Sequence, residues 1–296
     1  MIYRIQKILR WRSFYFSAAL LGGLTMLYSV AEFRISDWRY EFKLRKNHFG
    51  YKAEVKYHEN DARDIRYLEI GDDDKPLIVF IHGAPGSSAF WQRLLPDSSL
   101  LANAKLLAVD RAGYGYSGYG KPITDVAEHA RMIGQIIEEK SKQHETIILH
   151  GSSYGGTVSA RIAMDYPHLI DGLLLQSASL KSGAEKTYPI SYPTSHWMLR
   201  WAVPGSLKVA NAEKLSHHLS LDAMAPLWHQ IKAHTIVLQG TADGLIYPEN
   251  APYAYERLVN AESRQLQMIE GRGHDLLWTR TQLLKDSLIE LVGLCD

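Results

Sequence analysis

The segment 151–156, with the sequence GSSYGG, carries the residue types best suited to covalent chemistry. It lies between an apolar strand-like run and a run with helical spacing of apolar residues. A serine on a sharp strand-to-helix turn exposes its hydroxyl, provided that its neighbours have almost no side chain. Gly151 and Gly155 meet that condition. The spacing therefore favours Ser153 as the nucleophile over the adjacent Ser152.

A serine hydroxyl is a weak nucleophile, so it needs a base, an acid that orients the base, and donors for the oxyanion. Asp243 follows the strand-like run 235–238, and His274 lies on a glycine-flanked loop after 266–269. The HGAPG sequence at 82–86 follows another apolar run, where a backbone N–H can be directed toward an oxyanion. The chain thus supplies a nucleophile, an acid and a histidine, in that order.

Five motifs together resemble the α/β-hydrolase superfamily, and the resemblance covers about residues 53–294. They are HGAPG at 82–86, DRAGYGYS at 110–117, GSSYGG at 151–156, GTADGLIYP at 240–248 and GRGHD at 271–275. The resemblance implies an α/β fold with a mostly parallel, eight-stranded sheet flanked by helices. It also implies a small helical cap inserted after the sixth strand.

The resemblance further implies a Ser-Asp-His triad of Ser153, Asp243 and His274. The oxyanion would be bound by the backbone N–H groups of Tyr154 and Ala84, and no cofactor would be required. We expect a carboxylic ester with an apolar acyl or aromatic group as the substrate.

Three other functions stay open at this stage. HGxPG resembles proline iminopeptidases, but these carry Trp after the nucleophile, where this chain has Tyr154. They also need carboxylates for a substrate ammonium, and the predicted cap offers Glu185, Glu213 and Asp222. Carbon-carbon bond hydrolases share the triad. A ligand-binding receptor on the same fold belongs to a different class.

The apolar pattern predicts the elements that position these residues. Alternation at 53–58 and 65–70 predicts an antiparallel hairpin, and helical spacing predicts helices at 126–140 and 276–291. Fully apolar runs predict buried parallel strands at 77–81, 106–109, 146–149, 173–175, 235–238 and 266–269. The segment at about 181–228 breaks this pattern and predicts the cap. Its apolar pocket would be formed by Tyr188, Trp197, Met198, Leu199 and Trp201.

The N-terminal segment 1–31 differs from the rest of the chain. A basic flank precedes 19 uncharged residues, 13–31, which is about the length of a membrane-spanning helix. We expect a single-pass anchor in a bacterial inner membrane with the catalytic domain on the periplasmic face. The alternative is a cleaved signal peptide and a secreted or periplasmic protein. Residues 32–52 would form a juxtamembrane linker, and 53–296 the hydrolase domain.

Composition and spacing argue against several other functions. A net charge of +1 gives no indication of a nucleic-acid partner, and the single cysteine cannot form an internal disulfide. The GxGxxG pattern at 113–118 is followed by Pro122 rather than directly by a helix, which disfavours phosphate binding. The 13 histidines show no metal-ligand spacing. Asp110 and Arg111 are expected to fix their loop, and the resemblance to α/β-hydrolases implies that His82 braces the oxyanion loop.

Overall fold

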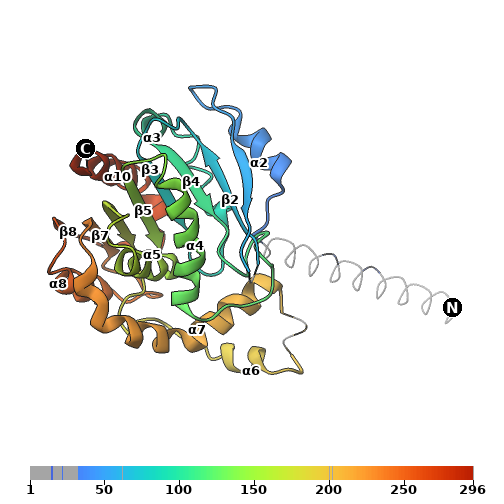
Figure 1. The fold of residues 1–296 in the computed structure, drawn as a ribbon. Helices are drawn as coiled ribbons and strands as arrows, with labels where there is room; N and C mark the ends of the chain where they lie inside the picture. The colour runs from blue at the N-terminus through green and yellow to red at the C-terminus, as the bar shows by residue number, and fades with distance from the viewer. Residues whose placement is uncertain are drawn as a thin grey trace.

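The computed structural model describes residues 15, 22, 33–61, 63–199, 201 and 203–295. An eight-stranded sheet forms its centre (Figure 1). The strand order is β1-β2-β4-β3-β5-β6-β7-β8. The pairs β1–β2 and β2–β4 are antiparallel, and the remaining five pairs are parallel. The strands are β1 (Glu54–His58), β2 (Ile65–Ile70), β3 (Leu77–Ile81), β4 (Lys105–Val109), β5 (Ile147–Ser152), β6 (Gly172–Gln176), β7 (His234–Gly240) and β8 (Arg264–Ile269).

Helices cover both faces of this sheet because the central strands are apolar on both faces. Alternate residues of β3 show the division: Val79 packs with α4 and α5, whereas Phe80 packs with α3 and α10. The helices and 3-10 helices are α2 (Asp37–Leu44), η1 (Ser88–Trp91), α3 (Ser98–Asn103), α4 (Val126–Lys140), α5 (Tyr154–Asp165), α8 (Asn250–Arg257), α9 (Leu276–Thr279) and α10 (Thr281–Cys295), with α6, α7 and η3 described below. The predicted α/β-hydrolase architecture is confirmed.

Most of the predicted elements occur within a few residues of their expected bounds. The hairpin, the six apolar strands and helix α4 agree with the sequence pattern. The single helix predicted at 276–291 is wrong, because the chain forms α9 and α10 with a break at Arg280. The Thr281 hydroxyl donates a hydrogen bond to the carbonyl oxygen of Leu277, and such side-chain bonds compete with regular helix bonding. The apolar stripe continues through this break, which explains why the pattern did not reveal it.

The connection between β6 and β7 contains the helices of the predicted cap. It includes α6 (Ser191–Ser195), α7 (Gly205–Met224) and η3 (Ala225–Gln230). Figure 1 shows α6 and α7 together along the lower edge of the molecule. The start of α7 is attached to the core, since the backbone N–H of Ser206 donates to the Tyr119 hydroxyl at 3.2 Å.

The predicted membrane anchor at 1–31 lies outside the described residues, apart from Tyr15 and Gly22. Within the part of the chain that the structure describes, no helix has the length and apolar content required to cross a bilayer. The predicted juxtamembrane segment contains α2, whose Tyr40 and Leu44 pack into the hydrolase core. This segment is therefore attached to the domain that follows it.

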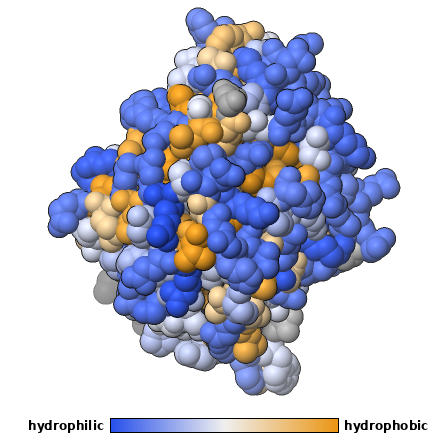
Figure 2. Space-filling view, turned by 60° about the vertical axis from the view of Figure 1, so that its left-hand side comes forward, coloured by the Kyte–Doolittle hydropathy of each residue, from blue (hydrophilic) through white to orange (hydrophobic). Residues whose placement is uncertain are grey.

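The surface seen in Figure 2 is largely hydrophilic, with apolar residues in separate patches. Such scattered exposure is normal for a globular protein. The cap segment differs, because several of its large apolar side chains are more than half exposed. These are Ile190, Tyr192, Trp197, Met198, Leu199 and Trp201.

Candidate active site

Ser153 occupies a strained turn between β5 and α5. Its φ of 55° and ψ of −124° are sparsely populated for a residue with a side chain and cost about 1–3 kcal/mol. The glycines around it allow the turn to pack closely. A Cβ atom on Gly155 would overlap the carbonyl oxygen of Ile81, and one on Gly151 would overlap the Ser159 hydroxyl. Ser153, rather than Ser152, is the residue at the strained position, as the spacing predicted.

Asp243 and His274 are brought together at the carboxyl ends of β7 and β8. Nδ1 of His274 lies 2.8 Å from Oδ2 of Asp243. The other carboxylate oxygen of Asp243 accepts backbone N–H bonds from Leu245 and Ile246, both at 2.9 Å. Burial would raise the pKa of Asp243, but the bonds and charge of His274 and the two amides outweigh burial and lower it. The ionised carboxylate is thus suited to fixing the tautomer of His274.

Ser153 and His274, the predicted nucleophile and base, are not hydrogen-bonded to each other in the structure. The Ser153 hydroxyl forms no hydrogen bond in the described part of the chain. Bonds between a nucleophile and its base are often long without substrate and tighten in the complex. Gly83 also lies close to Ser153, since a Cβ on Gly83 would be 3.6 Å from the Ser153 hydroxyl oxygen.

Ala84 and Tyr154, the predicted oxyanion donors, line the same cavity as Ser153. Among the described residues, neither backbone N–H donates to another backbone group, so both remain available to a ligand. Tyr154 is the first residue of α5, where the helix dipole favours negative charge. The two amides are therefore chemically suited to stabilising an oxyanion.

His82, Asp110 and Arg111 have the supporting positions expected from the sequence. The His82 ring is fully buried; its Nε2 accepts the Arg111 backbone N–H at 3.0 Å, and its Nδ1 donates to the Gly83 carbonyl at 2.7 Å. Burial, followed by the Arg111 charge, lowers the pKa of His82 well below its usual value, so the ring is neutral. Asp110 accepts the backbone N–H of Ser88 at 2.7 Å and the Arg66 guanidinium at 2.9 Å. These contacts fix the loops around Ser153.

A buried ion pair between Arg111 and Glu213 connects the cap to this loop. Both side chains are fully buried, and the guanidinium nitrogens lie 2.6 and 3.2 Å from the two carboxylate oxygens. Tyr114 and His129 also bond to Glu213. Arg111 in addition donates to the carbonyl oxygens of His82 and Gly83. Helix α7 is therefore joined through Arg111 to the loop that carries Ala84.

The sequence pattern does not predict this contact. Glu213 was a candidate for binding a substrate ammonium, but its carboxylate is paired with Arg111. Burial would raise the pKa of Glu213, but the Arg111 charge and the bonds from His129 and Arg111 lower it to about 2. The partners are separated by 102 positions in the sequence, so no local pattern could reveal their contact.

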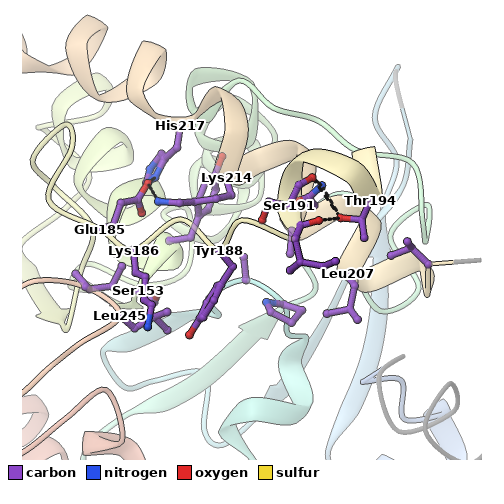
Figure 3. A pocket seen from close by; sticks show the side chains of 18 residues that line it. Ser153, Glu185, Lys186, Tyr188, Ser191, Thr194, Leu207, Lys214, His217 and Leu245 are labelled. Carbon is purple, nitrogen blue, oxygen red and sulfur yellow. Dashed lines mark hydrogen bonds and ion pairs between the residues drawn. The ribbon is translucent and has the colours of Figure 1, made fainter. Parts of the chain in front are cut away.

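A cavity of about 480 Å³ contains Ser153 in its wall (Figure 3). Such a volume is typical of a site for a small molecule. One part of the lining is apolar, with Ile190, Val203, Leu207 and Ala210. Of the five residues predicted to form an apolar pocket, Tyr188 alone is in the lining. The prediction for the other four is wrong, because Trp197, Met198, Leu199 and Trp201 are 51–78% exposed on the cap surface.

Another part of the lining is polar and includes Glu185, Lys214 and His217. Figure 3 shows Lys214 and His217 directed toward the Glu185 carboxylate, with distances of 2.6 and 3.0 Å. The other oxygen of Glu185 accepts a bond from the Ser179 hydroxyl at 2.8 Å. Burial would raise the pKa of Glu185, but the contacts with His217 and Lys214 lower it to about 2. Sequence reasoning identified Glu185 but neither of its two basic partners.

The described residues contain no cluster of His, Cys, Asp and Glu that could hold a metal ion.

Comparisons with known proteins agree with this architecture. Residues 76–202 match the family described as alpha/beta hydrolase fold. This match covers less than half of the chain, and together with the sheet topology it confirms the predicted resemblance at the level of the α/β-hydrolase fold. A solved structure of a membrane phospholipase A, described as a bacterial virulence factor, has a TM-score of 0.61. The match covers 99% of this chain and 98% of the chain in that structure. At 16% sequence identity it indicates a shared fold only.

Two curated relatives differ in how much of their length is matched. The sequence is 30% identical to Epoxide hydrolase 1 of Caenorhabditis elegans over 37% of this chain, but the match spans only 27% of that relative. Proline iminopeptidase PfmaB of Pestalotiopsis fici is 24% identical, with 75% of this chain and 93% of the relative covered. Relatives with different chemistries therefore share this fold, and the reaction must be inferred from the site.

The Arg111–Glu213 pair yields a test of stability. We expect Glu213→Ala to lower the free energy of unfolding by about 3–5 kcal/mol, because it leaves the Arg111 charge buried and unpaired. Glu249→Ala is the matched control. Glu249 pairs with Lys181 at 2.9 Å where both side chains are about half exposed, so its loss should change stability by about 0–1 kcal/mol. Urea unfolding at pH 7 measures both, and equal losses would contradict the proposed importance of the buried pair.

The lowered pKa of Glu213 predicts how this loss depends on pH. A carboxyl whose pKa falls from 4.5 when unfolded to about 2 when folded stabilises the protein above pH 4.5. That contribution is lost as pH falls toward 2. The destabilisation caused by Glu213→Gln, relative to wild type, should therefore shrink between pH 4.5 and 2. Urea titrations at several pH values measure this difference, which should stay constant if Glu213 is neutral in the folded protein.

Proposed function

We propose that this protein is a serine hydrolase that cleaves carboxylic esters with an apolar acyl or aromatic group. The observation that carries the proposal is the strained Ser153 in the wall of a cavity, together with His274 bonded to a buried Asp243. These are the parts of an acyl-transfer site: a nucleophile, a base and an acid that orients the base. The oxyanion donors would be the N–H groups of Ala84 and Tyr154.

The proposed reaction has two steps. His274 takes the proton of Ser153 as the serine oxygen attacks the ester carbonyl, and the carbonyl oxygen becomes an oxyanion bound by the two amides. His274 then returns the proton to the departing alcohol, which leaves an acyl group on Ser153. Water, activated by His274, hydrolyses this acyl-enzyme in the second step. Asp243 stabilises the imidazolium throughout.

The apolar part of the cavity supports the proposed acyl preference. Ile190, Val203, Leu207 and Ala210 offer aliphatic surface on the cap side of Ser153. Burial of an acyl chain there contributes about 0.8 kcal/mol per methylene group. Longer unbranched acyl chains should thus be preferred until the cavity is filled.

An aminopeptidase remains the second candidate, because the relative PfmaB is a proline iminopeptidase by name. A specific observation disfavours it. An aminopeptidase must hold a substrate ammonium with an unpaired carboxylate, but Glu185 is paired with Lys214, and Glu213 with Arg111. Asp222 is exposed and is not in the cavity lining. Carbon-carbon bond cleavage and ligand binding without turnover remain alternatives with the same residues.

A panel of matched variants tests the ester proposal. We expect Ser153→Ala to abolish both ester turnover and labelling by a fluorophosphonate probe, because the nucleophilic oxygen is removed. Asp243→Asn should reduce turnover by about 10⁴-fold, as a wrong histidine tautomer does in comparable triads. Ser152→Ala is the control and should be mild. Labelling lost in Ser152→Ala but kept in Ser153→Ala would refute the assignment, and labelling without any ester turnover would favour a receptor.

We also propose that residues 1–31 anchor the protein in a bilayer, with the hydrolase domain on the outer face. The support is the basic flank followed by 19 uncharged residues. The structural relative that covers 99% of this chain is, by its description, a membrane protein. An apolar helix across the bilayer would keep the cavity near lipid-soluble esters.

Fractionation of the full-length protein tests the anchor. It should sediment with membranes and resist extraction by high salt and by alkaline carbonate, because apolar burial rather than charge would hold it. A variant with Leu20, Leu21 and Leu24 replaced by Arg should be released into the soluble fraction. Mass spectrometry of the mature N-terminus separates the alternatives, since a start at Glu32 would show that the segment is a cleaved signal peptide.

A further inference from the structure

Two lysines and one acid carry the formal charges of the described cavity lining. Lys186 and Lys214 line the same cavity as Ser153, and Glu185 is the acid. The wall thus has an excess of one positive charge, if His217 is taken as neutral. Lys186 is among the exposed residues of this lining, so an ion pair formed there would be partly solvated.

Glu185 has little capacity left for a substrate cation. One of its oxygens is bonded to Lys214 and His217, and the other accepts the Ser179 hydroxyl. Its position is therefore fixed, and its charge is compensated within the wall. Lys214 in turn is held in place by Glu185 while two of its three N–H donors remain for other acceptors.

Of the two lysines in the cavity lining, Lys186 has no acidic partner among the described residues, whereas Lys214 is paired with Glu185. It lies next to Glu185 in sequence, and its backbone N–H donates to the Leu245 carbonyl at 2.8 Å. Its ammonium lies 4.9 Å from the centre of the Tyr188 ring. Contact with an aromatic face orients a lysine but leaves its charge uncompensated. An anion in the cavity would supply the missing partner.

We propose that this part of the cavity is a subsite for an anionic group, a carboxylate or a phosphate, on the ester substrate, bound by Lys186 and Lys214. The inference rests on the proposed ester hydrolysis, since it concerns the substrate of the same cavity. The substrate is then an amphiphile: an apolar group lies against Ile190, Val203 and Leu207, and a negative charge lies against Lys186 and Lys214.

Esters of matched length test this subsite. The acyl series is p-nitrophenyl hexanoate, its analogue with a terminal carboxylate, its analogue with a terminal phosphate, and its analogue with a terminal ammonium. A second pair, phenyl acetate and 4-carboxyphenyl acetate, places the charge on the alcohol side. We expect at least one anionic ester to exceed its neutral counterpart in kcat/KM, and the ammonium ester to be the poorest of its series. The carboxylate and phosphate arms distinguish the two sources of charge.

Variants identify the groups responsible. Lys186→Gln should lower the ratio of anionic to neutral kcat/KM by about threefold to fivefold, as expected for a partly exposed ion pair. Lys214→Gln should lower it at least as much, whereas Lys214→Arg should retain it. Glu185→Gln should change the ratio in the opposite direction, because it leaves Lys214 uncompensated. Lys181→Gln is the control, since Lys181 pairs with Glu249 and is not in the cavity lining, and it should leave the ratio unchanged.

The outcomes separate the subsite from the proposed reaction. If esters are cleaved but the ratio of anionic to neutral kcat/KM is near one, the subsite is overturned and ester hydrolysis is not. The same conclusion follows if Lys186→Gln and Lys214→Gln leave that ratio unchanged. If no ester is cleaved, ester hydrolysis fails, and calorimetric binding of adipate, hexyl phosphate and neutral hexanamide to wild-type protein then tests the subsite directly. Tighter binding of either anion, weakened by Lys186→Gln, supports the subsite; equal or absent binding refutes it.

Discussion

The close approach of the β5–α5 turn to β3 is the constraint on which the site depends. Gly155 leaves no room for a Cβ atom against the Ile81 carbonyl, and Gly156 leaves none against Ala178. These contacts bring the first turn of α5 down onto the sheet edge and hold Ser153 at its positive φ. The same approach places Gly83 beside Ser153. Both the exposure of the hydroxyl and the position of the HGAPG loop therefore follow from the absence of side chains at a few glycines.

The parts of the molecule that could be predicted from the sequence are those with a local cause. Fully apolar runs predict strands buried on both faces, and the turns after β3, β5, β7 and β8 all carry a motif. Because parallel strands end at the same edge of the sheet, the motif order was enough to expect Asp243 near His274. The roles of these residues in catalysis stay predictions.

The parts that could not be predicted depend on partners far apart in the chain. Helix α7 shows this best. Its buried residues Val209, Glu213, His217 and Leu221 recur every four positions and form one stripe. A sequence pattern would not assign Glu213 and His217 to a buried stripe, because charged and polar residues are rarely buried without partners. Their partners, Arg111 and Glu185, come from other segments. The opposite error concerns Trp197, Met198, Leu199 and Trp201, which were predicted to line a pocket but are exposed, because apolar character alone does not reveal whether another surface covers a side chain.

A second stripe of α7 lies beside the first. It links the attachment of the cap to the core with the charge of the cavity lining. The cavity is lined by Leu207, by Ala210 and Asn211 three and four residues further on, and by Lys214, which follows these two by four and three residues. Glu213 and Lys214 are neighbours in sequence, so one turn of the helix both bonds to Arg111 in the core and presents an ammonium to the cavity. Because Arg111 also donates to the carbonyl oxygens of His82 and Gly83, a shift of helix α7 along its axis would disturb both the Lys214–Glu185 contact and the loop that carries Ala84. The cap is therefore connected to the candidate oxyanion site through buried contacts, and changes in α7 should affect substrate preference and reaction rate together.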